Sequence, residues 1–432
     1  MVAQIYATGV NKIVSVVPET VYGALPSPLT GAVELRRIRA EMSLRAQAIQ
    51  SQEILASQQL SDARLGSRQA QGSLQGQLSP GAYGLFYQSL LRVPPTALSA
   101  TVATAAMTDT TLTVQSAAPF TFTIESTATN FQSTGFRVGD VVRPTGWTGA
   151  LLPFNNMNMR VTGISGTTDN ILTFAPAPDS QFLSTLNYST GQTVTLTRAG
   201  LKYLLPTTGQ VATSMSVEQW YSDISVSELA LGVFCTGATI NIPPNGFAQG
   251  QFTLLGQNMN PPGSVQQITG AATASTDVGT TGISGKISYA DPSGTAIDLA
   301  AITGINIQIQ SDASPEPVVG SPYTPQIFVG TMRVTGSLSV IMMVDQMTND
   351  FMSENDLQIA ALLTSAAAPV TPASQTIPFI NLWMPRVRLQ AMSHQDSDRA
   401  IIRNYQFAAL LSNATGASPT VDDTTIVIQD AM

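Results

Sequence analysis

A nine-residue pattern occurs twice in this chain of 432 residues. Residues 66–74 read Gly-Ser-Arg-Gln-Ala-Gln-Gly-Ser-Leu, and residues 330–338 read Gly-Thr-Met-Arg-Val-Thr-Gly-Ser-Leu. Both copies alternate in polarity, as a β-strand with two unlike faces does. Because self-similarity within a chain indicates a repeated structural unit, the pattern predicts one β-rich domain present twice, with equivalent residues 264 positions apart.

Each copy of the pattern is followed by a predicted helix. In the first copy, Ser79 and Pro80 are typical of an N-cap and a first helical residue. The apolar residues that follow at helical spacing are Tyr83, Phe86, Tyr87, Leu90 and Leu91. In the second copy, the comparable stretch contains Met347, Phe351 and Leu357.

A third repeated element shows that the two copies are unequal. Residues 251–255 resemble residues 406–411, but the first segment begins 179 residues after Gly72 and the second only 70 residues after Gly336. The first copy therefore holds 109 additional residues. Between about 100 and 206 the chain consists of short β-like runs separated by turn sequences, which predicts an inserted small all-β domain.

These repeats predict three domains. Residues 1–99 and 207–260 form a discontinuous first domain, residues 100–206 form the inserted domain, and residues 261–432 form the second domain. The Asn-Pro-Pro-Gly sequence at 260–263 marks the boundary between the two copies. Residues 264–285 are rich in Thr, Ala, Gly and Ser and are predicted to form a linker or an arm.

The predicted strands carry mostly uncharged polar residues on one face. The candidate residues of this face are Ser67, Gln69, Gln71, Ser73 and Gln75 in the first copy, and Asn306, Gln308, Gln310, Thr331, Arg333, Thr335 and Ser337 in the second. One interpretation is a plain solvated sheet face. The other is a wet wall that gives a passing polyanion nothing to bind, since neutralised phosphates hold DNA strongly.

The strand that precedes the pattern does not follow the same offset. Its polar set in the first copy is Ser43, Arg45 and Gln47, which an offset of 264 places on Ile307, Ile309 and Ser311. A shift of one residue exchanges the two faces of a strand. Either the register slips by one residue between the copies, or this strand is misaligned.

Two turn-rich segments, residues 52–65 and 312–326, separate the first two strands of each copy. The second contains prolines, which suit an extended loop that does not pair at a sheet edge. We expect either flexible surface loops or contacts with a neighbouring subunit. The candidate contact residues are Gln52, Glu53, Gln58, Asp62, Asp312 and Glu316.

Charged residues make up only 11% of the chain, against about 25% in an ordinary soluble domain. This composition fits a neutral β-rich protein, or a subunit covered mostly by copies of itself. The net charge is −8, and the three lysines (Lys12, Lys202 and Lys286) do not cluster with the arginines. High-affinity nucleic-acid binding is therefore not expected.

The residue types that carry most catalysis are scarce. A single cysteine, Cys235, excludes an intrachain disulfide and is expected to be buried and inert. The single histidine, His394, is predicted to lie in a polar turn, and the acidic residues Asp140, Asp169, Asp396 and Asp398 also look like turn residues. We predict no catalytic residue, no cofactor and no metal site, and no apolar segment suggests a membrane span.

Three blocks carry a resemblance to a known family. These are residues 215–252, the sequence Glu-Thr-Val-Tyr-Gly-Ala-Leu-Pro at 19–26, and residues 61–74. Together they resemble the tail tube proteins of long-tailed, siphovirus-like phages, over most of the chain outside 100–206. Cys235 and Gly237 are placed differently from the family pattern.

The resemblance implies a mainly β fold with two tandem tail-tube β-sandwich domains, each with a flanking helix. It implies rings stacked into a tube in the virion tail, assembled in the host cytoplasm, with double-stranded DNA in transit but not specifically bound. Tape-measure, terminator and tail-tip proteins are the implied partners. Because most family members have one domain and form hexamers, a fused pair predicts trimeric rings with pseudo-sixfold symmetry and the inserted domain outside.

A second hypothesis is a tail-tip or adhesin-like protein that binds glycans through residues 100–206. Such binding uses aromatic platforms, but only 6% of the residues are aromatic, and Trp147, Trp220 and Trp383 are scattered along the sequence.

Overall fold

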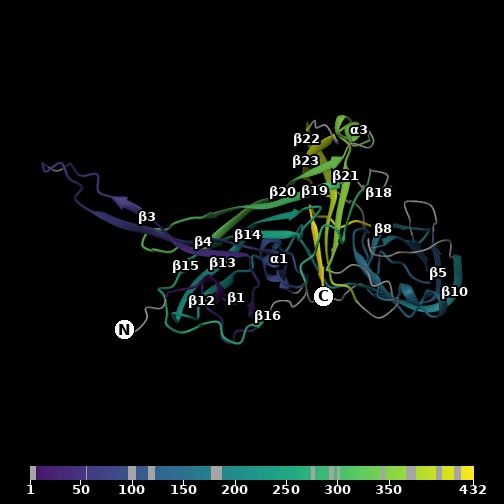
Figure 1. Cartoon of the computed structure of the whole chain (residues 1–432), viewed down its shortest axis with the longest axis horizontal. Coiled ribbons are helices and arrows are strands. Elements are labelled where there is room, and N and C mark those ends of the chain that lie inside the picture. Colours follow the sequence, from purple (N-terminus) through teal and green to yellow (C-terminus); the bar gives the residue numbers. More distant parts are fainter. Residues whose placement is uncertain are drawn as a thin grey trace.

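The structure is a computed structural model that describes residues 6–54, 56–95, 104–114, 122–176, 187–273, 278–290, 296–298, 302–341, 346–365, 376–395, 401–412 and 420–432. The protein is mainly β, as the sequence predicts. A long hairpin projects at one end of the molecule, and a small barrel lies at the other (Figure 1). Between them lie the sheets that the two sequence copies form.

The first copy contains η1 (Gly9–Asn11), β1 (Lys12–Pro18), β2 (Val33–Glu34), β3 (Arg39–Gln50), β4 (Ala63–Gln77), α1 (Gly84–Leu91), β12 (Met215–Tyr221), β13 (Val226–Ile242), β14 (Gln249–Gly256) and β15 (Asn258–Met259). The second contains β16 (Ala272–Thr273), β17 (Gly285–Ala290), β18 (Ala296–Asp298), β19 (Ile302–Pro315), β20 (Ile327–Ile341), α3 (Gln346–Met352), β21 (Leu357–Thr364), β22 (Phe379–Gln395), β23 (Ile402–Ala409) and β24 (Val427–Ala431).

The segment between them contains β5 (Thr104–Val114), β6 (Phe122–Glu125), β7 (Val141–Thr145), η2 (Gly149–Phe154), β8 (Met159–Ser165), β9 (Ile171–Pro176), β10 (Asn187–Arg198) and β11 (Leu201–Leu204). Strands β5 to β10 close into a barrel with its own apolar core. Strand β11 leaves the barrel and pairs with β24 of the second copy.

The strand pairings show the duplication directly. In the first copy β3 pairs with β4, β4 with β14 and β14 with β13. In the second copy β19 pairs with β20, β20 with β23 and β23 with β22. Strands β1 and β12 of the first copy correspond in the same way to β17 and β21.

Even the irregularities of the sheets repeat. The ladder of β3 and β4 shifts between Ala46 and Ala48, and that of β19 and β20 shifts between Ser311 and Ala313. The ladders of β13 with β14 and of β22 with β23 shift at equivalent places as well. Since a β-bulge bends the strand and re-aims its side chains, both copies curve in the same way.

The bulges and pairings resolve the alignment of the strand that precedes the pattern. Ser43 lies opposite Gln71, and Gln308 lies opposite Thr335, the counterpart of Gln71. Strand β3 therefore corresponds to β19 with an offset of 265, whereas β4 corresponds to β20 with 264. The slip of one residue is real, and it places polar residues of both copies on the same face.

The match between residues 251 and 406 is two residues out of register. Gly72 lies opposite Leu254 and Gly336 lies opposite Phe407, which gives an offset of 153 rather than the 155 of the sequence match. Because side chains alternate with a period of two, the error does not change which face these residues occupy.

The two copies share one sheet and one core. Residues Gly237–Ile242 of β13 pair antiparallel with Ile305–Gln310 of β19, and we call this pairing the internal seam. Apolar residues of both copies then form a single cluster, which includes Leu74, Phe252, Ile307 and Phe407.

The helices differ in detail from the prediction. Helix α1 begins at Gly84 rather than at Pro80, and Tyr83, not Ser79, occupies the N-cap position. Its apolar face packs on β14, where the Phe86 and Phe252 rings lie 5.1 Å apart. The second helix, α3, contains Met347 and Phe351, but Leu357 begins strand β21.

Three further expectations were wrong. His394 lies in strand β22, opposite Arg403, and not in a turn. Asp312 lies in β19, because backbone pairing with β20 continues to Pro315. The predicted linker at 264–285 packs against the first copy: Ile268 is fully buried, and its N–H donates to Glu218 at 2.6 Å.

The repeated glycines are required by close packing. A Cβ on Gly72 would lie 2.0 Å from the Glu41 carbonyl oxygen, and one on Gly336 would lie 2.4 Å from that of Asn306. We expect Gly72→Ala and Gly336→Ala each to lower the free energy of unfolding by about 1–3 kcal/mol, the usual cost of overpacking. Denaturant unfolding measures this change.

Gly304→Ala is the matched control, because its added Cβ has 3.7 Å to the nearest heavy atom. It should be tolerated. Equal destabilisation by all three variants would mean that loss of glycine, and not the close backbone approach, is responsible.

Candidate channel lining and subunit contacts

Uncharged polar residues form continuous rows across the joined sheet. Gln75 lies opposite Gln251, Gln251 opposite Thr239, Thr239 opposite Gln308, and Gln308 opposite Thr335. Residues that are directly opposite each other in a ladder share a face. One row of polar side chains thus crosses β4, β14, β13, β19 and β20, including the internal seam.

Most of the predicted face residues fall on this surface. Their pairing in the ladders brings together Gln69, Gln71, Ser73, Gln75, Asn306, Gln308, Gln310, Arg333, Thr335 and Ser337. Ser67 and Thr331 lie at the bulges of the two hairpins, so the ladder does not fix their face. We call the shared surface the polar face.

Sequence reasoning missed the contribution of three further strands. Strands β14, β13 and β23 add further polar residues to the same face, namely Gln249, Gln251, Thr253, Thr239, Asn241, Asn404 and Gln406. The alternation in residues 249–253, Gln-Gly-Gln-Phe-Thr, is the signal that could have identified the first of them.

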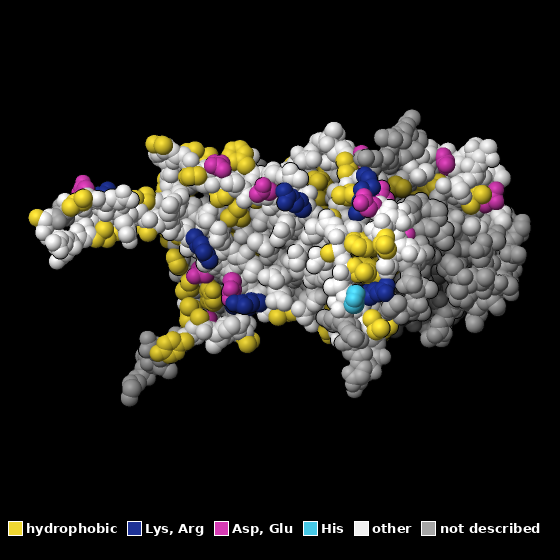
Figure 2. Space-filling model, turned by 90° about the horizontal axis from the view of Figure 1, so that it is seen from above, with side chains coloured by type: hydrophobic (Ala, Val, Ile, Leu, Met, Phe, Trp, Pro, Cys, Tyr) yellow, Lys and Arg dark blue, Asp and Glu magenta, His cyan; other side chains and the backbone are white. Residues whose placement is uncertain are grey.

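The opposite face of the same strands is the core. Leu74, Phe252, Ile240, Ile307 and Leu338 are 0–1% exposed. This difference fixes the register of the sheet, since a one-residue slip would bury the glutamines and expose the core. The polar face carries few charges, and Arg39 and Glu41 on β3 form an exposed ion pair at 2.7 Å. The molecular surface in Figure 2 likewise shows charged side chains only as scattered small groups.

The long hairpin of β3 and β4 carries four of the candidate contact residues. Gln52, Glu53, Gln58 and Asp62 lie exposed in the connection at its tip. Asp62 forms an exposed ion pair with Arg64 at 2.8 Å. The hairpin also exposes large apolar residues that the prediction omitted, namely Ile49, Ile54, Leu60 and Leu65. Apolar exposure of this kind is typical of a contact surface.

The corresponding connection in the second copy, residues 316–326, contains the exposed Glu316 and also lies against the first hairpin. The Arg68 N–H donates to the Pro322 carbonyl at 2.9 Å. Val319 is fully exposed there, and the nearby Phe328 is 53% exposed. Both connections therefore expose large apolar side chains.

The barrel is inserted in the first copy but docks on the second. The Gln429 side chain of β24 accepts a hydrogen bond from the Val141 N–H at 2.8 Å and donates to the Val141 and Ala199 carbonyls. The Asn381 amide donates to the Gly139 carbonyl at 3.0 Å. The barrel is therefore held by buried hydrogen bonds, which are costly to leave unmade.

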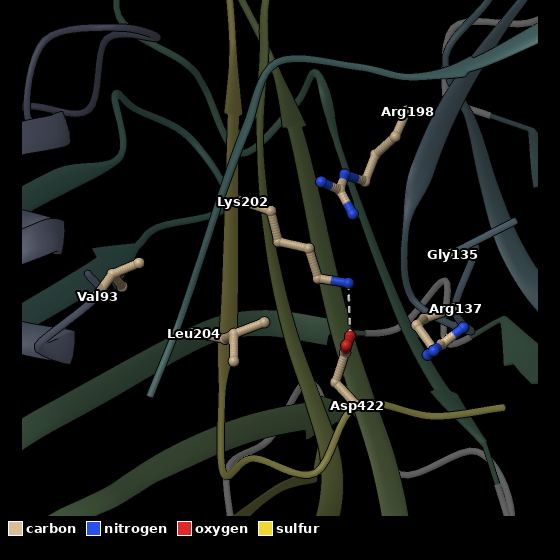
Figure 3. Close-up of a pocket in the computed structure, with 7 residues that line it drawn as sticks. All are labelled: Val93, Gly135, Arg137, Arg198, Lys202, Leu204 and Asp422. Atoms are coloured by element: carbon tan, nitrogen blue, oxygen red, sulfur yellow. Dashed lines mark ion pairs between the residues drawn. The ribbon is translucent and has the colours of Figure 1, made fainter. Parts of the chain in front are cut away.

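A buried ionic cluster lies at the same junction. The ammonium of Lys202 on β11 contacts Asp140, which precedes β7, and lies 2.6 Å from Asp422 (Figure 3). Burial alone would lower the pKa of Lys202, but the charges of both carboxylates outweigh it and raise that pKa. Arg137 and Arg198 line a cavity of about 230 Å³ beside this cluster.

Other candidate groups are placed where chemistry is not favoured. Burial raises the pKa of Cys235 to about 12, so the thiol stays protonated. Asp169 occupies a turn with φ of 52°, and Asp396 and Asp398 lie outside the described residues. Among the residues that the structure describes, no three His, Cys, Asp or Glu side chains are grouped to hold a metal ion.

The tryptophans do not form a binding platform. Trp147 is buried in the barrel core, and Trp383 is buried beneath the barrel, where Arg160 lies over its ring. Trp220 is half-buried on β12. In the described part of the chain, no helix has the length and apolar character of a membrane span.

Comparison with known proteins identifies a relationship over nearly the whole chain. The model of a family described as phage tail tube protein matches residues 9–422. No curated protein matches the chain.

Removing the Lys202 ammonium should loosen the barrel. Lys202→Met removes the cation that contacts both Asp140 and Asp422, and breaking a buried pair in this way costs about 3–5 kcal/mol. We expect earlier denaturant unfolding and faster amide hydrogen exchange in β7, β11 and β24. Neutralising both carboxylates in the same variant, by Asp140→Asn and Asp422→Asn, should recover part of the loss.

Arg64→Met is the control, because it removes a cation from the exposed pair with Asp62, which is worth about 0–1 kcal/mol. An effect of Lys202→Met no larger than that of Arg64→Met would show that the buried cluster does not hold the barrel.

Proposed function

The chain belongs to the phage tail tube protein family, and we propose that three copies close a ring whose polar faces surround a channel for DNA. As a tail tube protein it is a structural component of the virion tail. The rings stack into the tube through which the genome leaves during ejection into the host. The internal seam is the observation that carries this proposal, because it joins two equivalent wall segments within one chain.

Three chains supply six wall segments. The first copy contributes the strands β3, β4, β14 and β13, and the second contributes β19, β20, β23 and β22. Within one chain, the internal seam joins β13 of the first set to β19 of the second. Closing the sheet around an axis removes its edges, which would otherwise pair with other chains. The ring then has threefold symmetry and pseudo-sixfold walls.

The polar face suits the wall of a DNA channel. Glutamine, serine, threonine and asparagine keep the wall hydrated, and the absence of a basic stripe avoids the counter-ion release that drives DNA binding. In this arrangement DNA passes without specific binding, and the protein acts as a structural subunit rather than an enzyme.

We divide the chain into a first tube domain (1–99 and 207–260), an inserted domain (100–206) and a second tube domain (261–432). Three barrels then decorate each ring, since only the first copy carries the insertion. The connection between β3 and β4, with Gln52, Glu53, Gln58 and Asp62, and the connection between β19 and β20, with Glu316, contact the next ring. The tube ends contact terminator and tail-tip proteins, and the channel holds the tape-measure protein before ejection.

Imaging of purified particles tests the ring count. Averaged end-on views of tubes should show six similar inner segments and three outer densities, and cross-linked rings should have the mass of three chains. A protein that stays monomeric under every assembly condition would overturn the tube proposal, and six outer densities would overturn the trimer.

Charge added to the polar face should slow DNA transit. Gln75→Lys, Gln251→Lys and Gln308→Lys together place three cations in one row of each chain. We expect virions with this variant to eject DNA more slowly, with the delay shrinking as salt is raised.

The control places lysines at Ser165, Thr167 and Thr168, exposed positions at a barrel turn. Ejection at the normal rate from this control and slow ejection from the first variant are expected. Equal rates in both would show that the polar face does not line the channel.

A further inference from the structure

The internal seam has a counterpart that is open in the single chain. The offsets between copies place β3 residues 40–45 where β19 residues 305–310 lie, and β22 residues 391–395 where β13 residues 237–241 lie. Within the described residues, β3 pairs only with β4, and residues 391–395 pair only with β23. Each end of the joined sheet thus presents one half of a seam.

The exposure of equivalent residues supports a missing partner at β3. Leu44 is 42% exposed, whereas its counterpart Ile309, which faces Ala238 across the internal seam, is fully buried. On the other edge Met392, the counterpart of Ala238, is half-buried and packs against the edge of the core. An apolar residue at each edge therefore lacks its opposite neighbour.

We propose that β22 residues 391–395 of one chain pair antiparallel with β3 residues 41–45 of a second copy, in the register of the internal seam. This proposal rests on the ring arrangement above and specifies its joint. Leu44 then faces Met392 on the core side, and Ser43 faces Ser393 on the polar face. Arg45 lies opposite Ala391, and Glu41 opposite Gln395.

In the free chain, a side chain occupies this edge of β3. The Gln219 amide accepts from the Met42 N–H at 3.2 Å and donates to the Met42 carbonyl at 3.1 Å, as the backbone of a neighbouring strand would. The same amide also accepts from Lys12 Nζ at 2.5 Å and donates to Glu228 at 3.1 Å. Lys12 Nζ also donates to the Ala40 carbonyl at 2.7 Å.

This polar group is specific to the open edge. In the second copy, where β13 covers the corresponding edge, the counterparts of Lys12, Gln219 and Glu228 are Gly285, Ala361 and Leu382. Of the two equivalent sets of positions, the set beside the open edge of β3 therefore carries the hydrogen-bonding side chains. Gln219 acts as a guard that covers the edge until the arriving β22 displaces it, which limits unspecific edge pairing.

Disulfide trapping tests the joint. Met42 directs its peptide groups away from β4, so Ser43 and Ser393 form a non-hydrogen-bonded pair with Cα atoms about 4.5 Å apart, within the range of a disulfide. We expect Ser43→Cys with Ser393→Cys to give cross-linked trimers on mild oxidation of assembled rings. The natural thiol, Cys235, is buried and does not compete.

Two control pairs fix the register. Ser43→Cys with Met392→Cys places the thiols on opposite faces and should not cross-link. Efficient cross-linking of Ser43→Cys with Ala391→Cys, and not with Ser393→Cys, would reject the register. If the cysteine variants form rings on micrographs but none of these pairs cross-links, the joint is rejected and the tube function is not affected. If the wild-type protein forms no rings, the proposed function itself is rejected.

Removal of the Gln219 side chain tests whether this residue covers the β3 edge before assembly. Gln219→Ala should shorten the lag of tube assembly severalfold at equal protein concentration, because the Met42 peptide groups become available. Gln429→Ala is the control, since it also removes a buried amide with three hydrogen bonds, but at the barrel junction. If the assembly lag of Gln219→Ala equals that of the wild type or that of Gln429→Ala, Gln219 does not guard the edge.

Discussion

Backbone pairing between β13 and β19 is the interaction on which the rest of the structure depends. Six consecutive residue pairs join the sheets of the two copies. They also cover Ile307 and Ile309, whose burial contributes about 1.5–3 kcal/mol each. Without this seam, each copy would present an open sheet edge and an incomplete core. With it, one chain contains both sides of a joint between two equivalent sheets.

The insertion adds a second constraint between the copies. The barrel leaves the first copy after α1 and returns through β11, which pairs with β24 of the second copy. Gln429, Asn381 and Lys202 then fix the barrel against the second copy through buried polar contacts. The two copies are held together both by the internal seam and by these barrel contacts, so their relative orientation is set within the monomer.

The mainly β fold could be predicted from side-chain alternation in the sequence, and the recurring motif identified β4 and β20, which occupy equivalent places in the sheet. The sequence did not place Asp312 and His394 in strands, since both positions depend on long-range backbone pairing that polar side chains do not reveal. The connection between the two paired strands is one residue shorter in the second copy (316–326) than in the first (51–62), which explains why the offset changes between neighbouring strands. The contacts of Gln219 with Met42 join residues 177 positions apart and have no local signal.

Duplication within one chain allows the two copies to differ where a ring of identical single domains cannot. The edge that is always covered keeps Gly285, Ala361 and Leu382, which only need to pack. The edge that we propose to pair with another chain has Lys12, Gln219 and Glu228, and the hydrogen bonds of Lys12 and Gln219 satisfy peptide groups of β3 in the single chain. The buried Gln219 amide makes all four hydrogen bonds that a side-chain amide can make. It still replaces only one residue of a paired strand. In the proposed joint, an incoming strand replaces this amide with several peptide hydrogen bonds and buries Leu44, so the balance of interactions favours assembly.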